Sequence, residues 1–200
     1  AAPATWTHVT GVTTALSPSA AELVEAIIVG RAAGAARVSF DVNFRSVLWP
    51  TADAAARLLL ALARAADVVF VGSDEAEVLF GTAAAPALAD LILRRADQEL
   101  VLKRGAGPAS TLTLQGEVGE PALRVEVVEV TGAGDAFAAG YLAATVLGWP
   151  ARARLRLGHL MGSRTVGVLD HVPPPFSAAE LAALSPATLA ARWEGVASAE

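Results

Sequence analysis

The residues best suited to chemistry gather in one short stretch of the 200-residue chain, Thr-Gly-Ala-Gly-Asp at 131–135. An alternating run, Leu123–Val130, precedes it and predicts a strand, and an apolar helical pattern from Ala136 to Leu147 follows. Glycines at a strand-to-helix junction let the backbone turn sharply and leave the first amide groups of the helix exposed. Such a turn is suited to an anion, above all a phosphate, because bare N–H groups and the helix dipole both favour negative charge.

Asp135 closes this turn in the first predicted helical turn, where a negative charge is stabilised. A carboxylate beside an anion site suits phosphoryl transfer to an alcohol. Backbone donors hold the charge that spreads over the moving phosphoryl group, and the carboxylate takes the hydroxyl proton. A helix start capped by Asp135 is the open structural alternative.

Two other phosphate-binding motifs fit the stretch poorly. A dinucleotide fingerprint would need a third glycine where Phe137 stands, and an acidic residue about twenty residues further on, which is absent. A Walker loop is excluded because the chain contains no Gly-Lys-Ser/Thr triplet.

The sequence TGAGDAFAAGYL, residues 131–142, resembles the C-terminal motif of the ribokinase-like (PfkB) carbohydrate kinases, usually Asp-Thr-x-Gly-Ala-Gly-Asp-x-Phe. The resemblance implies that Asp135 is the catalytic base for the sugar hydroxyl and that Thr131 contacts the nucleotide. It also implies an anion hole formed by the three residues before the base, Gly132, Ala133 and Gly134.

Just before this motif, Glu129 and Val130 stand where the family usually has Asp and Thr. The same segment helps to build a monovalent-cation site in that family. A potassium requirement therefore stays open.

A second segment, Asp41-Val-Asn-Phe-Arg45 with Leu48-Trp49 after it, resembles the Asp-x-Asn-x-Arg…Leu-Trp segment of the 2-keto-3-deoxygluconate kinase branch. It places a guanidinium at the carboxyl end of a predicted strand, where it can bind a phosphate or a substrate carboxylate with two hydrogen bonds. Asp41, Asn43 and Arg45 are therefore predicted to contact substrate or phosphate. The alternative is that Asp41 and Asn43 satisfy loop amides while Arg45 pairs with an acid.

Glu75 falls at the place of the Glu in the family's Asn-x-x-Glu motif, which organises magnesium and phosphate through water. Gly72 occupies the Asn position of that motif. Because magnesium keeps much of its water shell, Glu75 is predicted to act on the ion through water. An ordinary acid in a first helical turn is the alternative.

The turn Lys103-Arg-Gly-Ala-Gly107 resembles the strand-turn by which these kinases approach the nucleotide, since glycines allow close backbone contact. Lys103, Gly105 and Gly107 are predicted nucleotide contacts, and a plain β-turn is the alternative. His159 takes the place of an Asn beside the adenine, against the alternative of a histidine on a helix face. ATP and Mg²⁺ are the cofactors that the resemblance implies, and a small-molecule sugar is the implied partner.

Strands and helices alternate along the first half of the chain, which predicts an α/β fold: a doubly wound, mostly parallel sheet with helices on both faces. A hairpin arm is predicted next, followed by helices only. The length suits a single domain over residues 1–200. The resemblance covers only the later part of a family member, so the N-terminal strands and the lid over the substrate are expected to be missing.

The expected elements are strands at 6–12, 37–42, 67–72, 99–104, 111–115 and 123–130, a loop at 116–120, and helices at 23–33, 51–65, 73–80, 85–96, 136–147, 151–168, 178–184 and 188–196.

Composition excludes several function classes. A net charge of −5 and an isoelectric point near 5.2 argue against a nucleic-acid partner. The cationic cluster Arg152, Arg154 and Arg156 is interpreted as a solvated helix surface. The uncharged, apolar run at 136–151 is shorter than the roughly 18 residues of a membrane span. The chain has no cysteine, and its three histidines lie too far apart to predict a zinc site.

The start of the chain has no basic region followed by an apolar one, so a cytoplasmic protein is expected. A sheet without its first strands would expose an apolar edge, and such edges pair with other chains. Homo-oligomers are therefore also expected.

Overall fold

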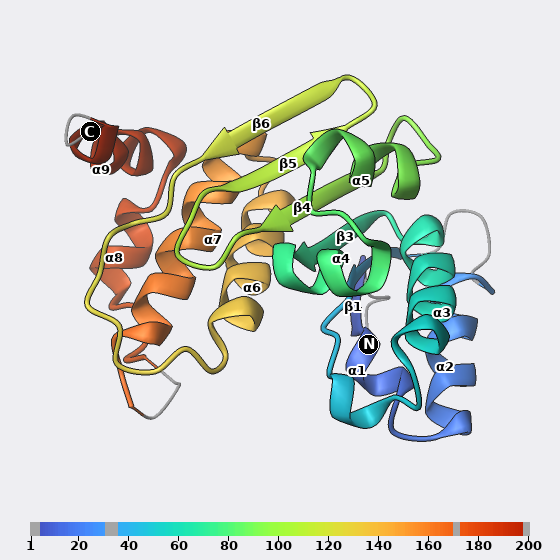
Figure 1. The fold of residues 1–200 in the computed structure, drawn as a ribbon. Coiled ribbons are helices and arrows are strands. Elements are labelled where there is room, and N and C mark those ends of the chain that lie inside the picture. The colour runs from blue at the N-terminus through green and yellow to red at the C-terminus, as the bar shows by residue number, and fades with distance from the viewer. Residues whose placement is uncertain (1–4, 31–35, 170–172, 198–200) are drawn as a thin grey trace. The chain divides into compact units, whose positions relative to one another are not determined.

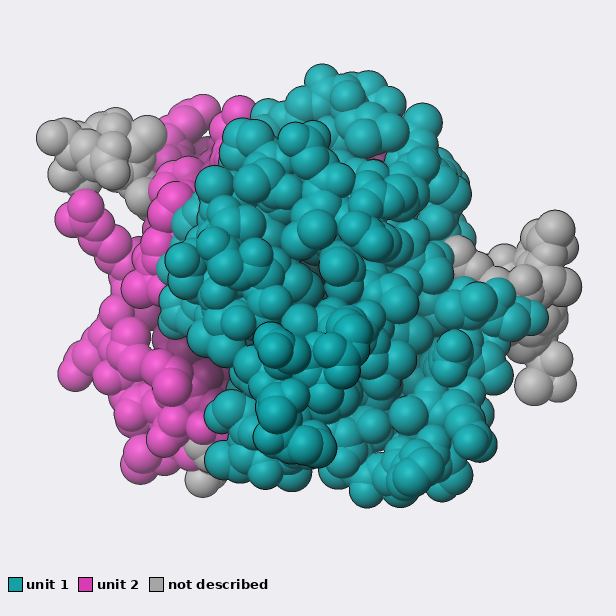
Figure 2. Space-filling model, turned by 45° about the vertical axis from the view of Figure 1, so that its right-hand side comes forward, with its two compact units in different colours: residues 1–105, 111–117 teal, residues 106–110, 118–200 magenta. Residues whose placement is uncertain are grey.

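The computed structural model describes residues 5–30, 36–169 and 173–197, and its contacts divide the chain into two compact units (Figures 1 and 2). Unit 1 comprises residues 1–105 and 111–117, and unit 2 comprises residues 106–110 and 118–200. Each unit is described by itself below. The prediction of one domain over 1–200 stays a prediction.

Four parallel strands form the sheet of unit 1, in which each strand pairs with the next along the chain. The register sets Thr10 opposite Asp41, and Gly72 opposite Lys103. Parallel pairing brings the carboxyl ends of these strands to one edge, where open α/β sheets bind ligands. The strands are β1 (Trp6–Thr10), β2 (Arg37–Asp41), β3 (Val68–Gly72) and β4 (Glu99–Lys103).

Helices connect these strands, and their starts follow the expected capping chemistry. Thr51 accepts a hydrogen bond from the Ala54 amide and caps the start of α3. Ser17 accepts a hydrogen bond from the Ala20 amide at the start of α2, where Pro18 occupies the first helical position. The helices of unit 1 are α1 (Gly11–Thr14), α2 (Pro18–Ile28), the 3-10 turn η1 (Ser46–Leu48), α3 (Ala52–Ala65), α4 (Ser73–Phe80) and α5 (Ala85–Ile92).

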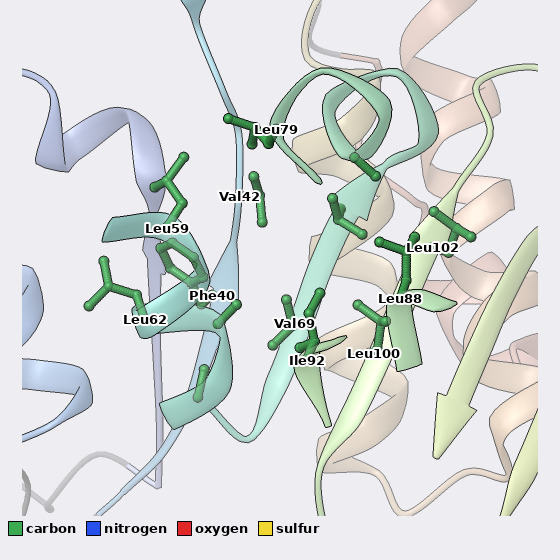
Figure 3. Packing of buried hydrophobic residues seen from close by; sticks show 14 of the residues in the cluster. Phe40, Val42, Leu59, Leu62, Val69, Leu79, Leu88, Ile92, Leu100 and Leu102 are labelled. Carbon is green, nitrogen blue, oxygen red and sulfur yellow. The ribbon is translucent and has the colours of Figure 1, made fainter. Parts of the chain in front are cut away.

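The core of unit 1 lies between the sheet and these helices (Figure 3). Alternate strand residues, such as Phe40, Val69 and Leu100, point into it, as the period of two in a strand requires. Leu59 of α3 and Leu88 of α5 are fully buried against them. Burial of a leucine contributes roughly 1.5–3 kcal/mol, so this layer holds the carboxyl ends of the strands in place.

Two further strands, β5 (Ala109–Thr113) and β6 (Gly116–Glu120), complete a six-stranded sheet in the order β1 to β6. They are joined by only two residues, Leu114 and Gln115, a connection that suits antiparallel strands. The predicted α/β fold with a mostly parallel sheet is confirmed. The predicted hairpin is wrong in its second arm, because residues 116–120 are strand and residues 123–130 are not.

Unit 2 is built mainly from helices, of which α6 and α7 pack at very short range. A Cβ atom on Gly140 of α6 would lie 2.6 Å from the Leu157 carbonyl oxygen of α7. A Cβ on Gly158 would lie 3.0 Å from the Phe137 ring. The two glycines therefore let the helix backbones approach closely. The helices are α6 (Ala133–Val146), α7 (Ala151–Val166), α8 (Ala178–Ala183) and α9 (Pro186–Ala197).

Helix α9 closes a small core in which Leu189 and Trp193 are buried against Leu160 of α7. Ser177 and Glu180 exchange hydrogen bonds in a capping box at the start of α8. In the described parts of the chain, every helix is too short or too polar to cross a membrane.

Candidate active site

The Thr-Gly-Ala-Gly-Asp stretch of unit 2 forms the start of α6. Gly132 is the N-cap and has φ 79° and ψ −8°, a left-handed conformation that favours glycine. The Ala136 amide donates to the Gly132 carbonyl oxygen at 2.9 Å, which closes the first helical turn. The helix therefore begins at Ala133, three residues earlier than predicted, and the glycine turn and Asp135 become parts of one helix start.

Asp135 lies in the first turn of α6 and is exposed. Gly134 beside it is exposed as well. Amide groups in the first turn of a helix point away from the helix along its axis and favour negative charge. The turn can accept an anion, and the Asp135 carboxylate is accessible to a reacting hydroxyl group.

Glu129 holds the residues that lead into this turn. Its Oε1 accepts hydrogen bonds from the amides of Val130 and Thr131, at 2.8 and 3.0 Å, and from the Thr131 hydroxyl at 2.9 Å. The amides of Val128 and Glu129 donate to the Val166 carbonyl oxygen at the end of α7. Glu129, at the position where the resemblance expects Asp, thus serves as the local acceptor that shapes this segment.

His159, a predicted nucleotide contact, lies in the packed interior of α7. Its ring lies edge-on to Phe137 at 5.2 Å and near Trp193 at 6.5 Å. Its Nε2 donates to the Glu120 carbonyl oxygen at 3.1 Å. Burial lowers the pKa of His159 to about 4, and the bond to Glu120 opposes that shift only in part. The geometry favours the alternative of a packed histidine on a helix face.

Glu120 also pairs with two of the three arginines that the sequence predicts to form a solvated helix surface. Its carboxylate, 3% exposed, pairs with Arg152 at 3.0 Å and with Arg156 at 3.0 Å. The guanidinium of Arg156 also lies 5.9 Å from the Trp193 ring centre. The solvated interpretation is therefore wrong for Arg156, whose side chain is only 14% exposed. The spacing of four between Arg152 and Arg156, which places both on one helix face, was the signal available in the sequence.

In unit 1, Asp41 and Lys103 meet at the carboxyl ends of β2 and β4. Lys103 Nζ lies 2.6 Å from Asp41 Oδ2, and the Asp41 side chain is 2% exposed. Asp41 Oδ1 accepts the Asn43 amide at 3.2 Å. A predicted substrate residue and a predicted nucleotide residue are thus joined by a buried ion pair.

Glu75, in the first turn of α4, uses both carboxylate oxygens on backbone amides. Oε2 accepts the Gly72 amide at 2.8 Å, and Oε1 accepts the Phe44 amide at 2.7 Å. Burial raises the pKa of Glu75, the charge of Asp41 raises it further, and the two amide bonds and Lys103 oppose the shift. The strongest of these effects is burial, so the carboxylate sits in a poorly hydrated place.

Arg45 is exposed, two residues beyond Asn43. Among the residues that the structure describes, its guanidinium has no hydrogen-bond or ion-pair partner, in contrast to the alternative in which it pairs with an acid. Asn43 has φ 36°, a left-handed conformation that is uncommon for residues other than glycine. The loop after β2 is therefore a turn of unusual geometry that carries an accessible guanidinium.

The predicted turn at 103–107 is divided between the units, since Gly105 belongs to unit 1 and Gly107 to unit 2. Gly105 has φ 57° and open space around its missing side chain. This conformation requires glycine and keeps the backbone accessible.

The described residues contain no group of three or more His, Asp or Glu side chains that could hold a metal ion. Each oxygen of Glu75 already accepts one amide hydrogen, which leaves one lone pair on each oxygen. A contact with magnesium through water, as the sequence predicts, stays a prediction.

Unit 2 also contains a cavity of about 600 Å³. None of the predicted site residues lines it, and most of its walls come from α7, α8 and α9. The turn at Gly132 is therefore a surface site separate from this cavity. The cavity is lined by Leu123, Arg124, Val125, Leu160, Ser163, Arg164, Phe176, Glu180, Ala183, Leu184, Thr188, Leu189 and Arg192.

The chain is similar in sequence to a known protein family and to individual enzymes. A family model described as pfkB family carbohydrate kinase matches residues 2–171. The chain is 30% identical to the 2-dehydro-3-deoxygluconokinase of Escherichia coli K12 over 158 residues, which cover 76% of the chain and 50% of that enzyme. It is 35% identical to the 2-dehydro-3-deoxygluconokinase of Thermoproteus tenax over 179 residues, covering 87% of the chain and 54% of that enzyme.

A solved structure resembles the fold as well. The aminoimidazole riboside kinase from Salmonella enterica, complexed with aminoimidazole riboside and an ATP analog, superposes with a TM-score of 0.72 at 28% identity. The match covers 94% of the chain and 62% of that structure. The chain spans about half the length of the curated relatives it matches.

Proposed function

Since the chain belongs to the pfkB family of carbohydrate kinases, we propose that the protein containing it is a cytoplasmic enzyme that transfers a phosphoryl group from ATP to a sugar hydroxyl. The acceptor is a sugar acid of the 2-keto-3-deoxygluconate type. The two 2-dehydro-3-deoxygluconokinases described above support this choice of substrate.

The observation that carries the proposal is the start of α6. Gly132 forms a left-handed N-cap, and Asp135 lies exposed in the first turn that follows. Charge develops on the phosphoryl oxygens in the transition state, and the amide groups of a helix start stabilise such charge. The same turn carries the group that can accept a proton.

In the proposed reaction, Asp135 takes the proton of the acceptor hydroxyl as its oxygen forms a bond to the γ-phosphorus of ATP. The bond between that phosphorus and the bridging oxygen breaks, and ADP leaves. Gly132, Ala133 and Gly134 form the anion hole, and Thr131, held by Glu129, borders the nucleotide.

Lys103 and Gly105 are the proposed nucleotide residues of unit 1. Lys103 is 17% exposed at its side chain and pairs with Asp41, so its charge is held at the carboxyl end of β4. The magnesium ion of the nucleotide would neutralise phosphate charge, and its contact with the protein would be through water. A potassium requirement is tested by replacing KCl with tetramethylammonium chloride in the same assay.

Two other functions have specific support. A fructokinase- or ribokinase-like substrate is the alternative within the family, supported by the aminoimidazole riboside kinase. A nucleotide-binding module without catalysis is the alternative outside it, because Gly72 and Val130 replace side chains that the family usually has there. Gly72 has no side chain to offer a ligand, and its backbone amide already donates to Glu75.

The test uses the full-length protein that contains this chain. ATP-dependent phosphorylation is measured with 2-keto-3-deoxygluconate, fructose, ribose and nucleosides, and we expect the highest kcat/KM for the sugar acid. Highest turnover with fructose or ribose would select the alternative within the family. Nucleotide binding without transfer to any alcohol would select the binding module and reject a kinase.

Light scattering on the separately purified chain, residues 1–200, measures self-association. β1 is an end strand of the sheet order in the described residues. A dimer or larger oligomer is the expected result for the isolated 200-residue chain.

A further inference from the structure

The loop after β2 turns at Asn43, whose backbone conformation is uncommon for a residue other than glycine. Asn43 has φ 36°, and the left-handed region is unfavourable for residues other than glycine. Asn tolerates this region better than most residues, but it still needs support from its surroundings. The Val42 amide before the turn donates to the Phe70 carbonyl oxygen of β3 at 2.9 Å, so the chain enters the turn from a fixed position.

Two carboxylates supply the support on consecutive amides. Asp41 Oδ1 accepts the Asn43 amide at 3.2 Å, and Glu75 Oε1 accepts the Phe44 amide at 2.7 Å. Hydrogen bonds to ionised acceptors are stronger than those between neutral groups. Together they can offset the strain at Asn43.

Each carboxylate is itself anchored by its second oxygen. Glu75 Oε2 accepts the Gly72 amide at the N-cap of α4, and Asp41 Oδ2 pairs with Lys103 at the end of β4. The turn after β2 is thus tied to the ends of β3 and β4. The consequence reaches Arg45, because its backbone follows directly after Phe44.

We propose that Glu75 is a positioning residue: with Asp41 it holds the left-handed turn at Asn43 and so presents the Arg45 guanidinium to the anionic group of the substrate. The part of this inference that concerns substrate rests on the proposed function. Glu75 then acts on Arg45 through the Phe44 amide and the turn at Asn43, in addition to any contact of its carboxylate with magnesium through water.

A helix cap alone would explain only half of the geometry. The bond from Glu75 to the Gly72 amide spans three residues and is the ordinary partner of a helix N-cap. The bond to the Phe44 amide spans 31 residues and joins two different strand ends. Glu75→Asp separates the two roles, because it keeps a carboxylate in the first turn of α4 but shortens the side chain by one methylene.

The first measurement is hydrogen exchange of backbone amides in the full-length protein, which needs no substrate. In Glu75→Gln the side chain keeps one carbonyl acceptor and presents an NH₂ donor in place of the other. We expect the Phe44 amide to exchange at least tenfold faster in Glu75→Asp and Glu75→Gln. Glu77→Gln, an exposed acid on the same helix, is the matched control and should leave Phe44 unchanged. Unchanged exchange of Phe44 in both Glu75 variants would overturn the inference.

The second measurement is steady-state kinetics with the acidic sugar that the protein turns over. Glu75→Asp should raise KM for that sugar about tenfold with little change in kcat, as Arg45→Ala should. The double variant should be no worse than Arg45→Ala, because both changes remove the same contact. A higher magnesium requirement in Glu75→Asp with KM for the sugar unchanged would overturn the positioning role.

The two measurements separate this inference from the proposed function. If the full-length protein phosphorylates no alcohol, the proposed kinase activity fails, while the exchange of Phe44 still decides whether Glu75 holds the turn. If the kinase activity is present and Phe44 exchange does not respond, only the positioning role fails.

Discussion

Acidification should destabilise the fold through His159, and the structure gives the size of the effect. The ring is 7% exposed and lies among Phe137, Trp193 and the Glu120 carbonyl group, where no anion compensates a positive charge on the imidazole. Burial lowers the folded-state pKa from 6.5 to about 4. The unfolded chain therefore binds the proton more readily, and the stability that neutral His159 provides is present above pH 6.5 and is lost as the pH falls toward 4.

The magnitude follows from the two pKa values. Each unit of difference corresponds to about 1.4 kcal/mol, so the full loss is about 3 kcal/mol, and most of it has occurred by pH 4.5. A loss of this size is a large part of the stability of a typical domain. It should be visible without any ligand.

The assay is urea unfolding at a series of pH values from 7.5 to 4.5, followed by tryptophan fluorescence. Other acids titrate in the same range, so the comparison is with His159→Gln, whose amide can still donate to the Glu120 carbonyl group but takes up no proton. The difference in unfolding free energy between wild type and His159→Gln should shrink by about 2–3 kcal/mol on going to pH 4.5. His8→Gln, which alters an exposed histidine, is the control and should not change the pH dependence. A difference that stays constant with pH, or an NMR titration of His159 with a midpoint near 6.5, would refute the reasoning.

Three further results are expected. Asp135→Asn should lower kcat of the full-length enzyme at least a hundredfold with little change in nucleotide affinity, because a general base acts as the proton leaves. The control Asp53→Asn, in the first turn of α3, should leave kcat unchanged. A drop in kcat below tenfold in steady-state assays would remove Asp135 from this role. Gly140→Ala should destabilise the protein by about 1–3 kcal/mol in urea unfolding, since its Cβ would lie 2.6 Å from a backbone oxygen, and exposed Ala139→Ser should not. Glu120→Gln should lower the free energy of unfolding by about 2 kcal/mol, because it removes the carboxylate that pairs with two guanidinium groups. An unchanged urea midpoint would show that these ion pairs do not stabilise the fold.

Local sequence signals predicted the alternation of strands and helices in unit 1 closely. The runs around Phe40, Phe70 and Val101 combine β-branched and apolar residues with short lengths, and each is a buried parallel strand. The start of the helix after Thr51 could be predicted because the Thr51 hydroxyl oxygen and the Ala54 amide that donates to it lie within one turn.

The segment before the glycine turn shows where such signals fail. Leu123–Val130 alternates and is rich in valine, yet Val125, Val127 and Val130 are exposed and the segment forms no strand. Strand propensity describes fit to a partly buried pleated surface, and a strand also needs a partner edge. Residues 116–120 contain two glycines and two glutamates and looked like a loop, but their two-residue connection to β5 brings them onto such an edge.

The candidate site also has a part that could be predicted from the sequence and a part that could not. The turn at Gly132 with Asp135 could be predicted because its chemistry is contained in five consecutive residues. The carboxylate of Glu75 could not be assigned to the Phe44 amide, since the two lie 31 residues apart and the bond depends on how β2 and β3 pair. His159 likewise shows its burial only once α9 has folded back over α7.

The close approach of α6 and α7 also limits how unit 2 can move. Sliding one helix along the other by a single residue would bring a Cβ atom to the place where Gly140 now meets the Leu157 carbonyl group. Packed backbones of this kind change between discrete arrangements and do not deform gradually. Asp135, on the first turn of α6, is therefore held in register with α7, whereas the backbone at 121–131 belongs to no strand or helix. The proposed base thus stands on the part of this region whose position is fixed by backbone-to-backbone contact.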